Sequence, residues 1–206
     1  MLDLFSGAGG CAVGYRRAGF EVVGVDSVFQ VNYPYRFVCM DALKVNPTRF
    51  DIIHASAPCQ RWSTLGGAAY PDLITPLRSL LEQWGKPYIL ENVPAAPLND
   101  PVLLCGRYFG LGATCGDGVY RHLKRHRIFE SSFTLTGTGC HCVAGDPIIG
   151  SYGTGTGTGS RRGYQGNSAE REQALGIDWM YMYEMAQAIP PAYTEFLGRQ
   201  ILEQMQ

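Results

Sequence analysis

The stretch Asp3–Gly10, DLFSGAGG, places three glycines directly after an apolar run at the start of the chain. Glycine has no Cβ, so such a turn lets the backbone approach a bound group closely at the N-terminus of the following helix. An ordinary tight turn between a strand and a helix would use the same residues, and the motif lacks the G-x-G-x-x-G spacing of dinucleotide folds. The stretch therefore predicts a strand, a glycine turn and a helix, and leaves the ligand open.

Short apolar runs alternate with polar or glycine-rich turns through the first half of the chain. Each run is short enough to be a strand buried on both faces, which is typical of parallel sheets flanked by helices. We therefore expect a doubly wound, mostly parallel α/β sheet, in which loops at the carboxyl ends of the strands share one crevice. The expected strands are Met1–Phe5, Glu21–Val25, Arg36–Cys39, Asp51–Ala55, Tyr88–Leu90 and Arg127–Phe129, and the expected helices are Cys11–Ala18, Leu73–Trp84, Glu170–Leu175, Tyr181–Ala188 and Tyr193–Met205.

The chain of 206 residues is long enough to bury the core of one domain, and we expect a single domain over residues 1–206. No clear periodicity runs through Ser131–Asn167, which contains SYGTGTGTGSRRGYQGN at residues 151–167. That run is too poor in apolar residues to pack. We expect the region 131–168 to be irregular and mobile.

Charge and cysteine usage bound the environment and partners of the chain. A net charge of −1 gives no global attraction to nucleic acid, so binding would need a local basic patch, for which RHLKRHR at Arg121–Arg127 is the candidate. The seven cysteines are an odd, scattered set, which suits reduced thiols better than a disulfide framework. No apolar run is long enough to span a bilayer and no secretory signal is visible. We expect a cytoplasmic protein with no membrane partner.

Two acidic residues follow the second and third expected strands. Asp26 lies about twenty residues after the glycine turn, where a nucleoside ribose is commonly held. Asp41 falls where it could accept a hydrogen bond from an exocyclic amine of a bound base. Together with the glycine turn they describe a nucleoside-cofactor pocket, although either aspartate alone is more often an ordinary turn former.

Cys59 and Glu91 follow the fourth and fifth expected strands, at the same edge of the sheet. A thiolate and a carboxyl group in one cleft suit covalent catalysis with acid assistance. Unpaired cysteines are frequently core residues, which is the alternative role for Cys59. Pro58 and Gln60 do not suit a core strand, however, and loops of this kind commonly carry function. We therefore predict that Cys59 is a nucleophile.

Five motifs occur in one order along the chain: DLFSGAGG, PCQ, ENV, RHR before an apolar residue, and AIPP. In this combination the chain resembles the C5-cytosine DNA methyltransferases, over Met1 to about Phe129 and again from about Ala186. The resemblance implies a Rossmann-like methyltransferase fold, S-adenosylmethionine as cofactor and DNA as substrate. It implies Cys59, Glu91, Arg125 and Arg127 as catalytic residues, and Phe5, Ser6, Gly7, Gly9, Asp26, Asp41 and Pro58 as cofactor-binding residues.

The resemblance also implies a mechanism. Carbon five of cytosine is a poor nucleophile, so the Cys59 thiolate adds at carbon six while Glu91 contacts the ring nitrogen and the exocyclic amine. The resulting enamine takes the methyl group, and loss of the carbon-five proton with release of Cys59 restores the ring. The base has to leave the duplex for this chemistry. Arg125 and Arg127 match paired arginines that help to hold the flipped base and the catalytic loop, with a phosphate contact or a solvated basic edge as the alternative.

The chain departs from the family pattern at several positions. Leu123 stands where the arginine motif has Gln, Arg61-Trp62 alters the PCQ loop, and Ala186-Gln187 replaces a Gly-Asn start. Family members carry a sizeable target-recognition domain where this chain has only residues 131–168, and base-edge readout needs a rigid element in a groove. We expect relaxed sequence specificity, or a partner protein that supplies it. Such compact versions resemble those encoded by phages. The alternatives to DNA methylation are the same reaction on RNA or on a cytosine nucleotide, and a non-catalytic regulatory role.

Zinc-ligating residue types occur in Cys140-His141-Cys142, with Cys105 and Cys115 elsewhere in the chain. The C-x-C spacing lacks the two intervening residues typical of structural zinc knuckles, and the flanking residues give no second paired motif. We therefore expect no metal site.

Three aromatic residues near the C-terminus, Trp179, Tyr181 and Tyr183, admit two roles. A base-stacking platform would present them to nucleic acid. Core packing would place them against the sheet, and this is the role that we expect.

Overall fold

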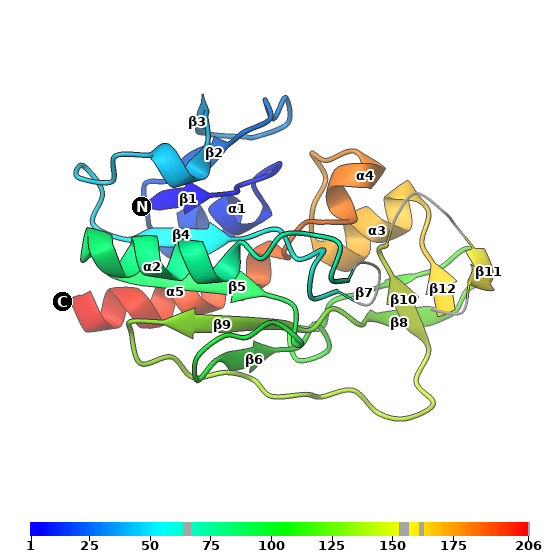
Figure 1. Cartoon of the computed structure of the whole chain (residues 1–206). Coiled ribbons are helices and arrows are strands. Elements are labelled where there is room, and N and C mark those ends of the chain that lie inside the picture. Colours follow the sequence, from blue (N-terminus) through cyan, green and yellow to red (C-terminus); the bar gives the residue numbers. More distant parts are fainter. Residues whose placement is uncertain (64–66, 153–156, 161–162, 206) are drawn as a thin grey trace.

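The computed structural model describes residues 1–63, 67–152, 157–160 and 163–205. Figure 1 shows a larger sheet with its helices on the left and a smaller sheet with α3 and α4 on the right. The larger sheet has the strand order β3-β2-β1-β4-β5-β9-β6. Its strands are β1 (Leu2–Leu4), β2 (Val23–Asp26), β3 (Arg36–Cys39), β4 (Ile53–Ser56), β5 (Tyr88–Asn92), β6 (Val102–Leu104) and β9 (Arg127–Ser131).

Strands β1 to β5 are parallel, and at one edge β9 pairs antiparallel with β5 and with β6. The parallel strands are short and apolar because helices cover both of their faces. Helices α1 (Gly10–Ala18) and α5 (Pro191–Met205) pack on one face in a common core, and α2 (Ile74–Trp84) packs on the other. The prediction of a doubly wound, mostly parallel α/β sheet is confirmed.

Helices α1 and α5 approach each other closely because glycine stands at their contact. A Cβ added at Gly14 would lie 2.0 Å from Thr194 Oγ1 and 2.2 Å from the carbonyl oxygen of Pro191. Thr194 Oγ1 also donates to the carbonyl oxygen of Cys11 at 2.9 Å. The glycine therefore sets the distance between the first and last helices of the sheet's covering layer.

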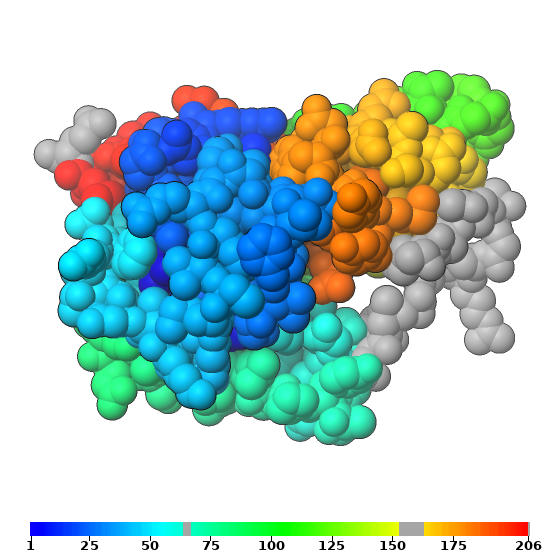
Figure 2. Space-filling model, turned by 90° about the horizontal axis from the view of Figure 1, so that it is seen from above, coloured from blue at the N-terminus to red at the C-terminus, as the bar shows by residue number. Residues whose placement is uncertain are grey.

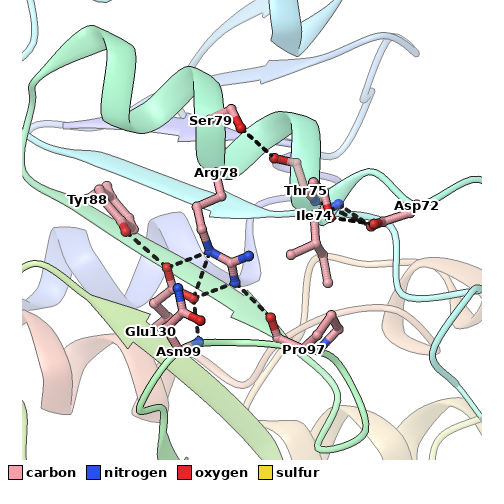
Figure 3. Close-up of polar contacts among 9 residues, drawn as sticks. All are labelled: Asp72, Ile74, Thr75, Arg78, Ser79, Tyr88, Pro97, Asn99 and Glu130. Carbon is pink, nitrogen blue, oxygen red and sulfur yellow. Dashed lines mark hydrogen bonds and ion pairs between the residues drawn. The ribbon is translucent and has the colours of Figure 1, made fainter.

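A buried ion pair ties α2 to the antiparallel edge of the sheet (Figure 3). Arg78 donates to both carboxylate oxygens of Glu130, with a shortest distance of 2.7 Å, and to the carbonyl oxygen of Pro97 at 2.8 Å. Glu130 also accepts from the Asn99 amide and the Tyr88 hydroxyl. Burial alone would raise the pKa of Glu130, but these hydrogen bonds hold it below its ordinary value. The carboxylate is thus the centre of a network that holds three segments together.

The smaller sheet has the strand order β11-β12-β10-β8-β7. Its core is a third apolar cluster, which includes Ala113, Leu123 and Ile149 of the sheet and Ala174 and Leu175 of α3. The remaining elements are β7 (Gly112–Thr114), β8 (Tyr120–Leu123), β10 (Ile148–Gly150), β11 (Gly157–Ser160), β12 (Gly163–Gln165), the 3₁₀ turn η1 (Ala42–Lys44), α3 (Ser168–Leu175) and α4 (Met182–Met185).

Several sequence predictions about the second half need correction. Ser131–Asn167 is not irregular throughout, because β10, β11 and β12 belong to it and join β8 in the smaller sheet. The expected mobility of the glycine–threonine run falls partly on residues 153–156 and 161–162, outside the described residues, and stays a prediction. Helix α4 is shorter than expected, and α5 begins earlier, at Pro191, because proline suits the first turn of a helix.

Two expectations concern the whole chain. All seven cysteines are free, in agreement with the expectation of reduced thiols. Among the helices that the structure describes, none combines the length and apolar character needed to cross a membrane. The single-domain organisation and the cytoplasmic location stay predictions.

Candidate active site

The carboxyl ends of β4 and β5 bring Cys59 and Glu91 to one edge of the sheet. β5 pairs in parallel with β4, so Glu91 lies opposite Ser56, three residues before Cys59. β9 runs antiparallel beside β5, and its first residue, Arg127, places Nε 3.2 Å from Glu91 Oε1. Glu91 is 4% exposed. The predicted nucleophile, acid and second arginine therefore lie at one edge of the sheet.

The loop after β4 holds Cys59 in a tight turn. The carbonyl oxygen of Cys59 accepts from the amides of Trp62 and Ser63 at 3.0 and 2.8 Å. At the start of the loop, Asn92 Nδ2 donates to the carbonyl oxygen of Ala57 at 2.9 Å, which fastens the loop to the end of β5. The Asn of the ENV motif is thus an anchor for the loop that carries the thiol.

Charge and burial act in opposite directions on the two reactive groups. Burial raises the pKa of the half-buried Cys59 thiol, Glu91 raises it further, and the arginine charges at 127 and 125 only partly offset this. Burial also raises the pKa of Glu91, against the opposing charge of Arg127. Burial therefore disfavours the charged form of both groups, and the nearby arginine charges favour the Cys59 thiolate.

Arg125 is an internal residue, because its side chain is only 1% exposed. Its guanidinium donates to the carbonyl oxygens of Ser151 and Ala186 at 3.0 and 2.8 Å. The hydroxyl of Tyr193 donates in turn to the carbonyl oxygen of Arg125. A solvated basic edge is excluded for Arg125, which instead joins the turn before β9 to the end of β10 and to Ala186, two residues before the AIPP motif.

The basic segment Arg121–Arg127 does not form a free patch for nucleic acid, contrary to the prediction. Most of its positive charge is engaged within the chain, and Lys124 is exposed. The engaged cations are Arg121, paired with Asp117 at 2.6 Å, Arg125, bonded to two backbone carbonyls, and Arg127, paired with Glu91.

The glycine turn after β1 adopts backbone conformations that favour glycine. Gly7 and Gly9 have φ of 49° and 87°, and Phe5 has φ of 56°, which is uncommon for a non-glycine residue and marks functional sites. A Cβ at Gly7 would meet nothing within 4 Å, so the turn faces open space there. Ser6 is buried, and its amide donates to the carbonyl oxygen of Val25.

Asp26 lies at the end of β2 and fixes the glycine turn. Its Oδ2 accepts from the Gly7 amide at 3.0 Å, and its Oδ1 accepts from the Val28 amide at 3.1 Å. Asp41 lies one strand further along, exposed at the end of β3, where its carboxylate accepts from the Leu43 amide at 3.0 Å. Asp41 thus has the role of a turn former in this structure, and Pro58 lies exposed at the Cys59 loop.

Sequence reasoning missed Asp3, which lies in β1 directly before the glycine turn. Asp3 is fully buried, and the Tyr33 hydroxyl is the polar side-chain group that interacts with its carboxylate. Burial raises the pKa of Asp3 to about 8, with the charge of Asp26 as the second cause. The sequence signal that could have identified Asp3 as a functional residue is an acidic residue inside an apolar strand, next to a glycine turn.

The C-terminal aromatic segment closes one side of the glycine turn. Trp179 Nε1 donates to the carbonyl oxygen of Ala8 at 2.9 Å. Figure 2 shows the orange segment around α4 lying against the blue segment after β2, where Asn32 Nδ2 donates to Glu184 Oε2 at 2.7 Å. The expected core packing is wrong for Tyr181 and Tyr183, which are 57% and 55% exposed and stacked on each other.

Residues 1–96 match the family model described as C-5 cytosine-specific DNA methylase. The match covers 96 of the 206 residues. The matched residues include the glycine turn, the Cys59 loop and Glu91, whereas the two arginines lie beyond them. The recognition made from the motifs is confirmed.

Curated relatives support the same family. The chain is 29% identical over 116 residues to the Type II methyltransferase M.XorII of Xanthomonas oryzae pv. oryzae, an alignment that covers 45% of this chain and 27% of that protein. It is 30% identical over 118 residues to the Type II methyltransferase M.AquIA of Picosynechococcus sp., covering 45% of this chain and 48% of that protein. The chain therefore spans about half, or less, of the length of the curated relatives it matches.

A solved structure confirms the fold. A putative DNA modification methyltransferase encoded within an Escherichia coli prophage matches with a TM-score of 0.66 at 15% identity, over 99% of this chain and 98% of that one. At this identity the likeness concerns the fold alone. The methyltransferase type of α/β fold is therefore confirmed over the length of the chain.

Proposed function

We propose that this chain transfers a methyl group from S-adenosylmethionine to carbon five of cytosine in DNA. The observation that carries the proposal is the joint placement of Cys59 and Glu91 at adjacent ends of parallel strands, with Arg127 Nε 3.2 Å from Glu91 Oε1. A thiol, a carboxyl group whose pKa is raised by burial and two nearby arginine charges are the groups that covalent addition to a pyrimidine needs. The match of residues 1–96 to the C-5 cytosine-specific DNA methylase model supports the same reaction.

The described residues at the ends of β1 and β2 fit S-adenosylmethionine. The turn faces open space at Gly7, Asp26 lies at the strand end where a ribose is commonly held, and Asp3 is a buried carboxyl group directly before the glycine turn. When bound, this cofactor supplies the methyl group as an electrophile. The residues proposed to hold it are Phe5, Ser6, Gly7, Gly9, Asp26, Asp41 and Pro58.

In the proposed mechanism the Cys59 thiolate adds to carbon six of the cytosine ring. Glu91, whose pKa is raised by burial, holds a proton toward the ring nitrogen, so that negative charge does not build up on the base. Arg127 orients Glu91 and favours the thiolate of Cys59. After methyl transfer, loss of the carbon-five proton and release of Cys59 restore the aromatic ring.

The substrate base has to leave the duplex to reach Cys59. Residues 131–168 supply the short strands β10, β11 and β12 at this end of the molecule, and Arg125 bonds to Ser151 directly after β10. Strands of three or four residues offer little rigid surface for a groove. We therefore propose relaxed sequence specificity, or specificity supplied by a partner protein.

The test is methyl transfer from tritiated cofactor to duplex DNA, RNA or dCMP by the wild-type chain, Cys59→Ser and Cys115→Ser. Cys115 is a matched control because it is a free, buried thiol in the smaller sheet. We expect label in duplex DNA for wild type and Cys115→Ser, and none for Cys59→Ser. Cysteine-dependent label in RNA or dCMP alone would change the substrate, and label that survives Cys59→Ser would overturn the mechanism.

Two further measurements define the product. DNA containing 5-fluorocytosine should form a covalent adduct with wild type and not with Cys59→Ser, because fluorine blocks the final elimination. Bisulfite sequencing of DNA from cells that express the chain should show both the activity and the sequence context of the methylated cytosines. Binding of cofactor and DNA without any transfer would favour a regulatory protein instead.

A further inference from the structure

Four side chains with metal-ligating atoms converge beside the turn that carries Arg125 and Arg127. Their ligand atoms all lie within 4.8 Å of one another. The four come from three separate parts of the chain: one follows β6, one lies between β8 and β9, and two lie in the segment between β9 and β10. They are Cys105, His126, Cys140 and Cys142.

The fold brings a second pair of ligands to Cys140 and Cys142, which the sequence argument against a metal site did not find. That argument rested on the lack of a second ligand pair beside Cys140 and Cys142. Cys105 and His126 provide it, but each is distant in sequence, so no local spacing reveals them. Cys115, which the sequence also offered, lies instead in the core of the smaller sheet.

The distances agree with tetrahedral coordination by sulfur and nitrogen. Zinc binds cysteine sulfur at about 2.3 Å and histidine nitrogen at about 2.0–2.1 Å, which in a tetrahedron places two sulfurs about 3.8 Å apart and a sulfur and a nitrogen about 3.5 Å apart. Cys105 Sγ and Cys142 Sγ are 3.8 Å apart, and Cys142 Sγ lies 3.5 Å from His126 Nε2. We propose that Cys105, His126, Cys140 and Cys142 bind a zinc ion.

The neighbouring hydrogen bonds indicate which histidine is the ligand. His141 stands between the two loop cysteines, but its Nε2 lies 3.0 Å from the carbonyl oxygen of Thr138, and its backbone amide donates to Cys105 Sγ at 3.5 Å. An amide directed at a sulfur stabilises a metal-bound thiolate. His141 therefore supports the site from outside, and His126 supplies the nitrogen.

Four protein ligands leave no open position, so the zinc is structural. The segment 132–147, between β9 and β10, contains no helix or strand in this fully described stretch. It is tied to β6 and to the turn that follows by the Thr138 amide, which donates to the carbonyl oxygen of Leu103 at 2.9 Å, and by an ion pair between Arg107 and Asp146. A metal would cross-link this long irregular segment to the sheet.

The zinc site also touches the proposed catalytic pocket through one residue. His126 lies between Arg125 and Arg127, and its carbonyl oxygen accepts from Arg127 Nη1 at 2.8 Å. Metal at His126 would fix the turn from which both guanidinium groups project. The zinc therefore has a positioning role for the arginine pair, and its presence is measurable without any catalytic assay.

The test measures the metal content of the full chain, purified without a histidine tag and under reducing conditions. Elemental analysis should find one equivalent of zinc in wild type and background zinc in Cys140→Ser, with Cys39→Ser as the matched control because both cysteines are exposed and free. The adjacent histidines form a second matched pair: His126→Gln should lose zinc and His141→Gln should retain it.

A measurement on wild type guards against variants that fail to fold. Exchange of the metal for cobalt should give a thiolate-to-cobalt charge-transfer band and the intense d–d bands of a tetrahedral site. No zinc uptake by the reduced wild-type chain, or no charge-transfer band with cobalt, would overturn the proposal. An intact mass that shows a Cys105–Cys142 disulfide in the reduced-purified chain would also overturn it and assign the pair to redox chemistry.

Discussion

Replacement of Arg127 by Met should destabilise the chain by leaving Glu91 charged and unpaired in the interior. The side chains of Arg127 and Glu91 are 11% and 5% exposed, and Arg127 Nε lies 3.2 Å from Glu91 Oε1. At an effective dielectric constant of 20, unit charges at that distance interact by about 5 kcal/mol. Part of this is offset by desolvation of both groups, and the loss of one partner of a buried pair typically costs about 3–5 kcal/mol. We expect Arg127→Met to lower the free energy of unfolding by about 3 kcal/mol at neutral pH.

The pH dependence separates this charge effect from lost packing. The folded-state pKa of Glu91 is already raised by burial, and removal of Arg127 raises it further. A folded-state pKa above the unfolded value means that stability is full below the unfolded pKa and is lost as pH rises. The deficit of Arg127→Met against wild type should therefore be small under acidic conditions, where Glu91 is protonated, and should grow as pH rises through the folded pKa of Glu91.

Urea unfolding over a pH series measures both quantities. Arg199→Met is the matched control, because Arg199 forms an exposed pair with Glu195 on α5 and should cost less than about 1 kcal/mol. The double variant with Glu91→Gln should recover most of the loss, since the uncompensated charge is then gone. A deficit below about 1 kcal/mol, or one that is equal at low and neutral pH, would refute the reasoning.

Three further predictions concern residues outside the ion pair of Arg127 and Glu91. Asp3→Asn should flatten the pH dependence of stability: burial raises the pKa of Asp3 to about 8, so between pH 5 and 7 wild type should lose about 1.4 kcal/mol per pH unit more than the variant in urea unfolding. Gly14→Ala should lower stability by about 1–3 kcal/mol in thermal unfolding, because the new Cβ would lie 2.0 Å from Thr194 Oγ1 and force α1 and α5 apart. Glu130→Gln should cost about 2–3 kcal/mol at neutral pH by leaving the partly buried Arg78 without a charged partner, and the difference from wild type should shrink as denaturation is measured at lower pH, where wild-type Glu130 becomes protonated.

The sequence predicted the centre of the fold because the parallel strands have a simple pattern. β1, β2, β4 and β5 are short apolar runs buried by helices, and each ends at a residue that changes character: the glycine turn, Asp26, the Cys59 loop and Glu91. Parallel strands deliver their carboxyl ends to one edge, so the order along the chain was enough to bring Cys59 and Glu91 together.

Several short strands escaped the sequence analysis because the alternation of apolar runs and polar turns that predicted the parallel strands is lost after Glu91. β6, β7, β8, β10 and β12 are no shorter than β1, but their pairing depends on neighbours far away in the chain. The aromatic residues Tyr181 and Tyr183 led to a wrong prediction of core packing, since they stack on each other at the surface.

Partnership between distant side chains was the other limit. Nothing local distinguishes Arg125, whose side chain is internal, from Lys124, which is exposed. Likewise, the approach of Cys105 and His126 to the loop cysteines follows from the way β6, β8 and β9 meet. Such contacts are properties of tertiary structure, and a basic or cysteine-containing motif alone does not encode them.

The packing of α1 against α5 has a consequence for synthesis of the chain. α1 ends at Ala18 and α5 begins at Pro191, so the helix made first waits for its partner while the residues between them are translated. At about 5–20 residues per second this interval is roughly 10–35 s. During that time the apolar face of α1 stays uncovered on the ribosome. We therefore expect chaperones to bind the N-terminal half of the sheet during synthesis. Truncation before α5 should yield a product that aggregates instead of a smaller folded unit.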